Sequence, residues 1–153
     1  MTHNHSADER AIRDIVAKTE AAWNAGDAAG FCAAMADDVD FINVVGEHRH
    51  GREAVERAHR FIFDTLYKGS RVRFAVDGIR FVRPDVALVF IHARLNARVQ
   101  LSAVASATRQ IQMSDESHES EARPTMVMHE DGGNWRIVAF QNTSVAPIAT
   151  ARA

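Results

Sequence analysis

The sequence predicts a single α+β domain, residues 1–153, in which helices precede a curved and mainly antiparallel sheet. Apolar residues recur at helical spacing in three segments before Gly69, and they alternate with polar residues in most segments after it. Helices followed by strands in this order are typical of an α+β domain. A chain of 153 residues can bury one substantial core. We expect the two ends, 1–6 and 147–153, to be flexible.

The composition argues against several classes of partner. The formal net charge is −2 and Lys and Arg do not cluster, so neither nucleic acid nor an anionic membrane surface is an expected partner. No run approaches the roughly 18 apolar residues of a membrane span, and residues 1–5 lack the pattern of a signal peptide. The single cysteine, Cys32, rules out an internal disulfide and favours a cytoplasmic location.

Two helices are predicted in the first 36 residues. Ser6 and Glu9 have the spacing of a capping box, so the first helix begins there and its apolar face reaches Trp23. Gly26 suits the left-handed residue that ends a helix, and Asp27 suits the N-cap of the next one. The second helix would bury three side chains, those of Phe31, Cys32 and Met35. We interpret this cysteine as a small buried hydrophobe rather than a nucleophile.

A first strand over Val39–Val45, a polar turn and a third helix beginning at Gly51-Arg52 follow. From Ser70 the period becomes two, and the apolar parity flips after Gly78, which predicts a β-bulge there. A long strand begins at Val86 and runs to about residue 101. Two further strands are expected over 123–130 and 134–145. The polar segment 102–122, between the long strand and the strand at 123–130, is predicted to be a mobile loop insertion.

Three segments carry a resemblance to a known superfamily. These are Ile42–Gly46, His50–Arg52 and Trp135–Thr143, together with the order of helix, Asp-capped helix, acidic turn and strand at the start of the chain. They resemble the nuclear transport factor 2-like superfamily, and within it the SnoaL-like cyclases and the SgcJ/EcaC family. The resemblance runs from Ala7 to Ser144. It implies a cone-shaped, cystatin-like fold whose curved sheet wraps around a small-molecule pocket.

Ketosteroid isomerases share this fold, and their chemistry does not carry over. Asn43 stands where the resemblance places their general base, and an amide does not accept a proton at neutral pH. Thr19 and Met126 stand where their two oxyanion donors would lie, and neither can replace them. The sequence also has no Gly-rich phosphate loop, GxSxG elbow or CxxC motif. We therefore expect neither that reaction nor a cofactor.

The resemblance also implies which side chains face the pocket. His59 and Phe63 share one stripe of the third helix, and His92 shares a strand face with Phe90. The implied inner positions form a set of twelve: Thr19, Trp23, Met35, Asn43, His59, Phe63, Phe90, His92, Arg94, Met126, Ala139 and Gln141. Such a pocket would be apolar at depth with a few polar groups, as small-molecule sites usually are.

His92, Arg94 and His59 are the candidate catalytic residues. Facing inward, Arg94 would hold an anion while His92 acted as a base that titrates near neutrality. The alternative is that this strand face is exposed or lies in a dimer contact, with Arg94 in a surface ion pair. His59 would either face them across the pocket or rest at the core edge with one satisfied hydrogen bond.

His48 and His50 point to the same side of a short strand, as zinc or copper ligands would. No third ligand stands at a recognisable spacing, so we interpret the pair as part of an exposed hairpin. No metal site is predicted.

Three hypotheses for function follow. The first is a protein that binds a small aromatic or polyketide-like metabolite, and the second is an acid–base enzyme acting on such a ligand. The third is an association module, since the same fold serves that role in calcium/calmodulin-dependent kinases.

A homodimer through the outer sheet face is also expected, because the strand after Val86 is apolar on both faces. The residues assigned to that outer face are Ala87, Val89, Ile91, Ala93, Leu95, Val138 and Phe140. The alternative is that the segment 102–122 folds back over this face.

Overall fold

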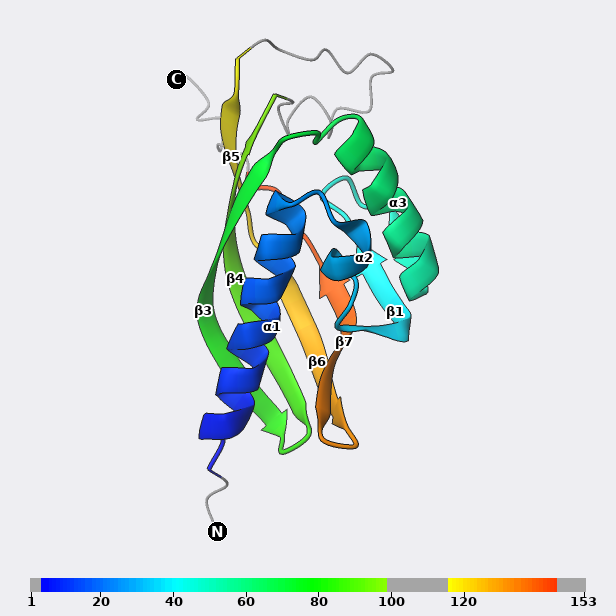
Figure 1. The fold of residues 1–153 in the computed structure, drawn as a ribbon. Coiled ribbons are helices and arrows are strands. Elements are labelled where there is room, and N and C mark those ends of the chain that lie inside the picture. Colours follow the sequence, from blue (N-terminus) through cyan, green and yellow to red (C-terminus); the bar gives the residue numbers. More distant parts are fainter. Residues whose placement is uncertain (1–3, 99–115, 146–153) are drawn as a thin grey trace, which may run out of the picture.

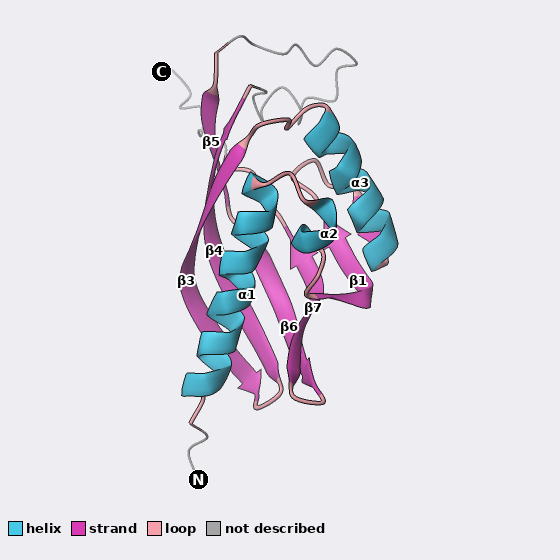
Figure 2. Ribbon diagram, viewed as in Figure 1, coloured by secondary structure: helices cyan, strands magenta, loops and turns pink. Residues whose placement is uncertain are grey.

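The computed structural model describes residues 4–98 and 116–145. Within them, three helices lie on one curved mixed sheet, and the sheet wraps around α1 and α2 (Figures 1 and 2). The α+β fold with helices before a curved sheet, expected from the sequence, is confirmed. In chain order the elements are α1 (Ser6–Asn24), α2 (Ala28–Phe31), β1 (Met35–Ile42), β2 (His48–His50), α3 (Arg52–Asp64), β3 (Arg71–Arg83), β4 (Val86–Ala97), β5 (His118–Ala122), β6 (Thr125–Asp131) and β7 (Asn134–Gln141).

The strand order is β2-β1-β7-β6-β4-β3, with β5 added to β4. The pair β1 and β7 is parallel, and the other pairs are antiparallel. On its side away from β3, β4 pairs with β6 along Val86–Phe90 and with β5 along Ala93–Ala97. This change of neighbour extends the sheet beyond the ends of β6 and β7, at the end of the molecule where α3 lies on the opposite side (Figure 1). At that end, the extended part of the sheet and α3 therefore lie opposite each other.

The predicted helices form, with two local corrections at their ends. Oδ1 of Asn4, not a capping box, accepts the hydrogen bond from the backbone N–H of Ser6 at 3.1 Å. Asp27 is the N-cap of α2 as predicted, because its Oδ1 accepts from the N–H of Gly30 at 2.9 Å. Met35 was expected on the second helix, but α2 ends at Phe31 and Met35 opens β1.

The strand predictions are corrected mainly in the segment 102–122. His118–Ala122 form β5, a strand rather than part of a loop. Residues 99–115 lie outside the described residues, as do 1–3 and 146–153. The bulge predicted in β3 is confirmed, since the register with β4 shifts between Val76 and Gly78.

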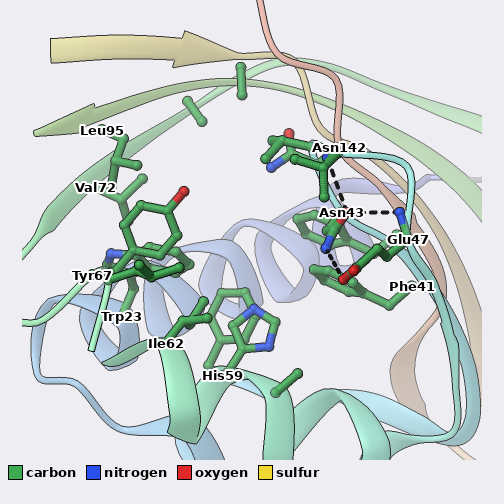
Figure 3. Close-up of a pocket in the computed structure, with 18 of the residues that line it drawn as sticks. Trp23, Phe41, Asn43, Glu47, His59, Ile62, Tyr67, Val72, Leu95 and Asn142 are labelled. Atoms are coloured by element: carbon green, nitrogen blue, oxygen red, sulfur yellow. Dashed lines mark hydrogen bonds between the residues drawn. The ribbon is translucent and has the colours of Figure 1, made fainter. Parts of the chain in front are cut away.

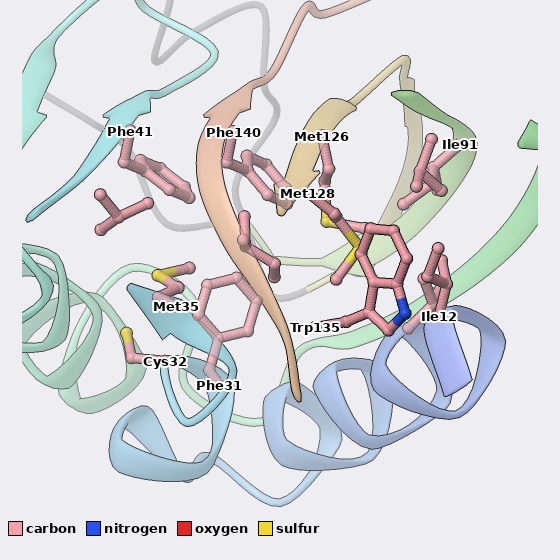
Figure 4. Packing of buried hydrophobic residues seen from close by; sticks show 14 of the residues in the cluster. Ile12, Phe31, Cys32, Met35, Phe41, Ile91, Met126, Met128, Trp135 and Phe140 are labelled. Carbon is pink, nitrogen blue, oxygen red and sulfur yellow. The ribbon is translucent and has the colours of Figure 1, made fainter. Parts of the chain in front are cut away.

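One end of the cone, which we call the packed end, is solid. Large side chains from α1, β6 and β7 meet there with almost no exposure (Figure 4). Nε1 of Trp135 donates a hydrogen bond to Oδ1 of Asp8 at 3.0 Å, which ties β7 to the first turn of α1. The core residues that define this end are Ile12, Ile91, Met126, Met128, Trp135 and Ile137.

The faces assigned to β4 and to the end of β7 from the sequence are wrong. Ala87, Val89 and Ile91 are buried inside the cone, not on its outer surface. In β7 the register shifts opposite Val127 and Met128, so Ile137 and Phe140 both point inward. A bulge of this kind places two consecutive residues between inward positions. Those two are Val138 and Ala139, which are half-buried.

Candidate functional site

The other end of the cone, which we call the open end, contains a cavity of about 560 Å³ (Figure 3). Its wall comes from all three helices, the β1–β2 hairpin, strands β3, β4, β5 and β7, and the segment after β7. The lining residues are Trp23, Phe31, Phe41, Asn43, Val44, Val45, Glu47, Arg49, Ala58, His59, Phe61, Ile62, Leu66, Tyr67, Val72, Phe74, Ala93, Leu95, Ala122, Phe140 and Asn142. Most of these side chains are apolar, and the volume falls in the range of small-molecule pockets.

His59 on α3 lies in the cavity wall and is 5% exposed. Its ring stacks on Phe31 with the centroids 4.3 Å apart, and Phe41 meets it edge-on at 5.2 Å. Trp23 and Phe63 approach it edge-on from the other sides. Burial lowers the pKa of His59 from 6.5 to about 4. The imidazole is therefore neutral at pH 7.

Trp23 and Tyr67 form the part of the wall nearest to β3. Nε1 of Trp23 donates to Oγ of Ser70 at 3.0 Å, so the polar edge of the indole is already satisfied. The Tyr67 ring lies 5.6 Å from the indole, and burial raises the pKa of Tyr67 to about 12. The hydroxyl group is therefore protonated at neutral pH.

The most exposed lining residues ring the mouth of the cavity. Phe61 on α3 is 63% exposed, and Val45 lies in the β1–β2 turn. Asn43 organises that turn: its Oδ1 accepts from the N–H groups of Val45 and Glu47, and its Nδ2 donates to Oε2 of Glu47 at 3.1 Å. The same Glu47 oxygen pairs with Arg49 at 3.0 Å. The charges at the mouth are thus already paired with each other.

The structure brings together three of the predicted pocket residues, Trp23, Asn43 and His59. His92 and Arg94 were expected to face inward, and this orientation is wrong. Ala93 and Leu95 line the cavity instead. Because side chains alternate along a strand, those of His92 and Arg94 point to the outer face. There Nε2 of His92 lies 2.9 Å from Oε2 of Glu121 on β5.

The other predicted inner residues lie away from the cavity lining. Thr19 is buried, and its hydroxyl donates to the carbonyl oxygen of Ile15 at 2.8 Å. Phe63 is buried behind His59 and Trp23. Two methionines, Met35 and Met126, belong to the solid core. The remaining three residues, Phe90, Ala139 and Gln141, are at least partly exposed, and the alternation of burial along β4 and β7 places them on the outer face.

Several lining residues were not identified from the sequence. Tyr67 shares the predicted stripe of His59 and Phe63 but is not one of the twelve implied inner positions, and in the structure it lies just after the end of α3. Asn142 follows the expected Gln141 by one residue, and the β7 bulge accounts for that shift. Ala93, Leu95 and Ala122 carried no recognisable signal, because small and apolar side chains are common on either face of a strand.

His48 and His50 are exposed on β2, as the hairpin interpretation predicted. Nε2 of His48 and Nδ1 of His50 lie 2.8 Å and 2.9 Å from Oδ1 of Asp40. The hydrogen bond with Asp40 raises the pKa of His50, and the bonds from His50 and His48 lower that of Asp40. Within residues 4–98 and 116–145, no group of three or more His, Cys, Asp or Glu side chains is arranged to hold a metal ion.

Comparisons with solved structures return the same fold. A domain of unknown function with a cystatin-like fold from Nostoc punctiforme is 28% identical, with a TM-score of 0.77 over 95% of this chain and 82% of that one. An uncharacterised cystatin-like protein from Caulobacter vibrioides is 25% identical, with a TM-score of 0.77 over 92% of each chain. A putative scytalone dehydratase from Novosphingobium aromaticivorans is 13% identical, with a TM-score of 0.74 over 95% and 96%.

The family comparison agrees with the structural one. No curated protein matches the sequence. None of the helices in the described ranges is long and apolar enough to span a membrane. The model of the SnoaL-like domain matches residues 16–135, which include all of α2, α3 and β1–β6. The chain therefore belongs to the SnoaL-like family, within the nuclear transport factor 2-like superfamily.

Proposed function

We propose that the protein binds a small aromatic or polyketide-like metabolite in the cavity at the open end. The observation that carries this proposal is the group of aromatic rings around His59, which faces about 560 Å³ of space. Aromatic faces and edges provide large contact areas for planar ligands. The chain keeps this space open, although filling it with larger side chains would stabilise the fold.

Two proteins of the same fold bear names of enzymes that act on small molecules. One is a putative scytalone dehydratase, and the other is a hexachlorocyclohexane dehydrochlorinase. We keep the narrower SgcJ/EcaC affiliation and a cytoplasmic location as predictions.

Acid–base turnover of such a ligand is the second candidate. His59 is the one imidazole among the described lining residues, and Tyr67 is the one phenol. A histidine whose pKa is about 4 is a weak base at neutral pH, and this ranks turnover below binding. His92 and Arg94, the other two candidate catalytic residues, are separated from the cavity by the sheet itself.

A thermal-shift screen with uncharged aromatic compounds, together with native mass spectrometry of the purified protein, tests the proposal. We expect bound or added ligand to raise the melting temperature. Ala93→Phe should fill the cavity and abolish the shift, whereas His92→Ala, one residue away on the outer face, should keep it. The proposal is wrong if no aromatic compound stabilises the protein, or if Ala93→Phe still responds.

We also propose that the protein forms a homodimer through the outer face of the sheet. The contact residues differ from those that the sequence predicted for this face. Six of those seven residues are buried inside the cone: Ala87, Val89, Ile91, Ala93, Leu95 and Phe140. The true outer face of β4 and β6 carries Leu88, Phe90 and Val127, and Phe90 is 41% exposed. Leu88 and Val127 are direct cross-strand partners, so these side chains form one apolar patch.

Light scattering at micromolar concentration tests the dimer. We expect twice the 16.9 kDa of one chain, and we expect Phe90→Asp to reduce it to the mass of one chain. Wild-type protein that scatters as a single chain would exclude the dimer.

A further inference from the structure

The two ring nitrogens of His59 have different roles. Nδ1 lies 2.8 Å from the carbonyl oxygen of Val55, one turn earlier on α3. A carbonyl oxygen can only accept, so Nδ1 carries the hydrogen and donates it. In a neutral imidazole, Nε2 is then an unprotonated acceptor. No described residue donates a hydrogen bond to Nε2, although the residue is only 5% exposed.

The surroundings of His59 keep it in this form. The rings of Phe31 and Phe41 cover it, and neither can donate a conventional hydrogen bond. Burial among them disfavours the imidazolium, which lowers the pKa to about 4. At neutral pH, Nε2 of His59 is therefore a hydrogen-bond acceptor held in place in the cavity wall. Its donor must come from a molecule inside the cavity.

Two further polar groups of the cavity agree with this reading. Oδ1 of Asn142 is buried and accepts no hydrogen bond from any described residue. The hydroxyl group of Tyr67 has no hydrogen-bond partner among the described residues, and it can accept as well as donate. Figure 3 shows Asn142 and His59 on different sides of the cavity, with Tyr67 beside the indole of Trp23. A buried acceptor without a donor, such as Oδ1 of Asn142, is uncommon in folded proteins. Together with Nε2 of His59, it indicates that the cavity suits a ligand that donates hydrogen bonds.

The charges in the cavity wall select against anions. Among the described lining residues, Arg49 is the one permanent cation, and it is paired with Glu47 at 3.0 Å. Nε2 of neutral His59 would repel a carboxylate, since both are acceptors. A carboxylate entering the cavity would thus lose its water without gaining a free cation, and a neutral donor such as the hydroxyl group of Tyr67 would not compensate for that loss.

We propose that the cavity selects uncharged aromatic molecules that carry a hydroxyl or N–H group, and that this group donates a hydrogen bond to Nε2 of His59. The inference rests on the proposed function and names the ligand class within it. It does not depend on any reaction taking place, because a hydrogen bond to a fixed acceptor positions a bound molecule without chemistry.

Isothermal titration calorimetry with three matched probes tests this on the wild-type protein. Indole has an N–H donor, benzofuran has the same shape without the donor, and indole carboxylate adds a negative charge. We expect indole to bind about tenfold more tightly than benzofuran, the value of one net hydrogen bond, and the carboxylate to bind more weakly than either. Equal affinities for indole and benzofuran, or a preference for the carboxylate, would overturn the inference and leave the proposed function intact.

His59→Phe supplies the second arm, because phenylalanine preserves the ring packing and removes Nε2. We expect this variant to bind indole and benzofuran with equal affinity, close to that of benzofuran for the wild type. A tenfold preference for indole that survives in His59→Phe would assign the acceptor of the indole N–H to another group and refute the role of His59. If none of the three probes binds the wild type, the proposed function itself fails for ligands of this size.

Discussion

The packed end and the open end share one sheet face and differ in the size of the side chains that cover it. At the packed end, β6 and β7 contribute Met126, Met128 and Trp135, and the space is filled (Figure 4). At the open end the same face of β4 and β5 carries alanines, Ala93 and Ala122, opposite the aromatic rings of α1 and α3. Short side chains on the wall leave the space in which a ligand fits.

This difference separates stability from function along the length of the domain. The core at the packed end is filled, so replacing a large side chain there by a small one leaves a void. Side chains at the open end already border empty space, and their removal enlarges a cavity that exists. We therefore expect stability to depend mostly on the packed end, and binding mostly on the open end.

The largest expected effect comes from a matched pair on β4. Ile91 and Leu95 lie on the same face of the strand, 2% and 7% exposed, but Ile91 belongs to the packed end and Leu95 lines the cavity. Ile91→Ala should lower the free energy of unfolding by about 3–4 kcal/mol, and Leu95→Ala by about 1–2 kcal/mol. Urea denaturation of both variants measures the difference. Equal losses would mean that the cavity wall is as tightly packed as the core.

The second effect is a pH dependence that arises at the open end. The pKa of His59 is about 4 in the folded protein and 6.5 as the ordinary value, so between these pH values the unfolded chain binds more protons. Stability is therefore complete above about pH 6.5 and falls as the pH decreases toward 4, by about 3 kcal/mol in total.

Carboxyl groups titrate in part of the same range, so the control is the variant His59→Phe. Its free energy of unfolding should fall much less than that of the wild type between about pH 7 and pH 4.5, with both measured by urea denaturation. Two parallel curves would show that His59 gains its proton in the folded protein without penalty.

The two ends also differ in how far they follow from the sequence. The α3 stripe with His59 and the β3 bulge were predicted, because helical spacing and a parity flip at Gly78 are visible in one segment alone. The faces of β4 were not, since its first half is apolar on both sides and a shift of one residue exchanges every side chain. That single exchange placed His92 and Arg94 in the site and removed Ala93 and Leu95 from it.

The site as a whole depends on contacts that no segment contains. Phe31 stacks on His59 from a different helix, and Asn142 enters the cavity only because the β7 bulge shifts the positions after Ile137. The bulge has no glycine to indicate it, unlike the one in β3. Contacts between separate elements and bulges of this kind depend on how the strands and helices pair in the fold, so one sequence without its fold does not reveal them.

The smallest expected effect reverses the direction of the substitution. Ala87 is at the packed end of β4 and fully buried, whereas Ala93 faces the cavity six residues later on the same face. Ala87→Leu must force extra atoms into filled space and should cost about 1–3 kcal/mol. Ala93→Leu places the same atoms in the cavity, gains apolar contacts there, and should change stability by less than about 1 kcal/mol in either direction. Urea denaturation measures both variants, and ligand titration of Ala93→Leu should show weakened binding because the added side chain occupies ligand space. If Ala93→Leu is instead as damaging as Ala87→Leu, the cavity closes in solution, and the open end is a second packed core.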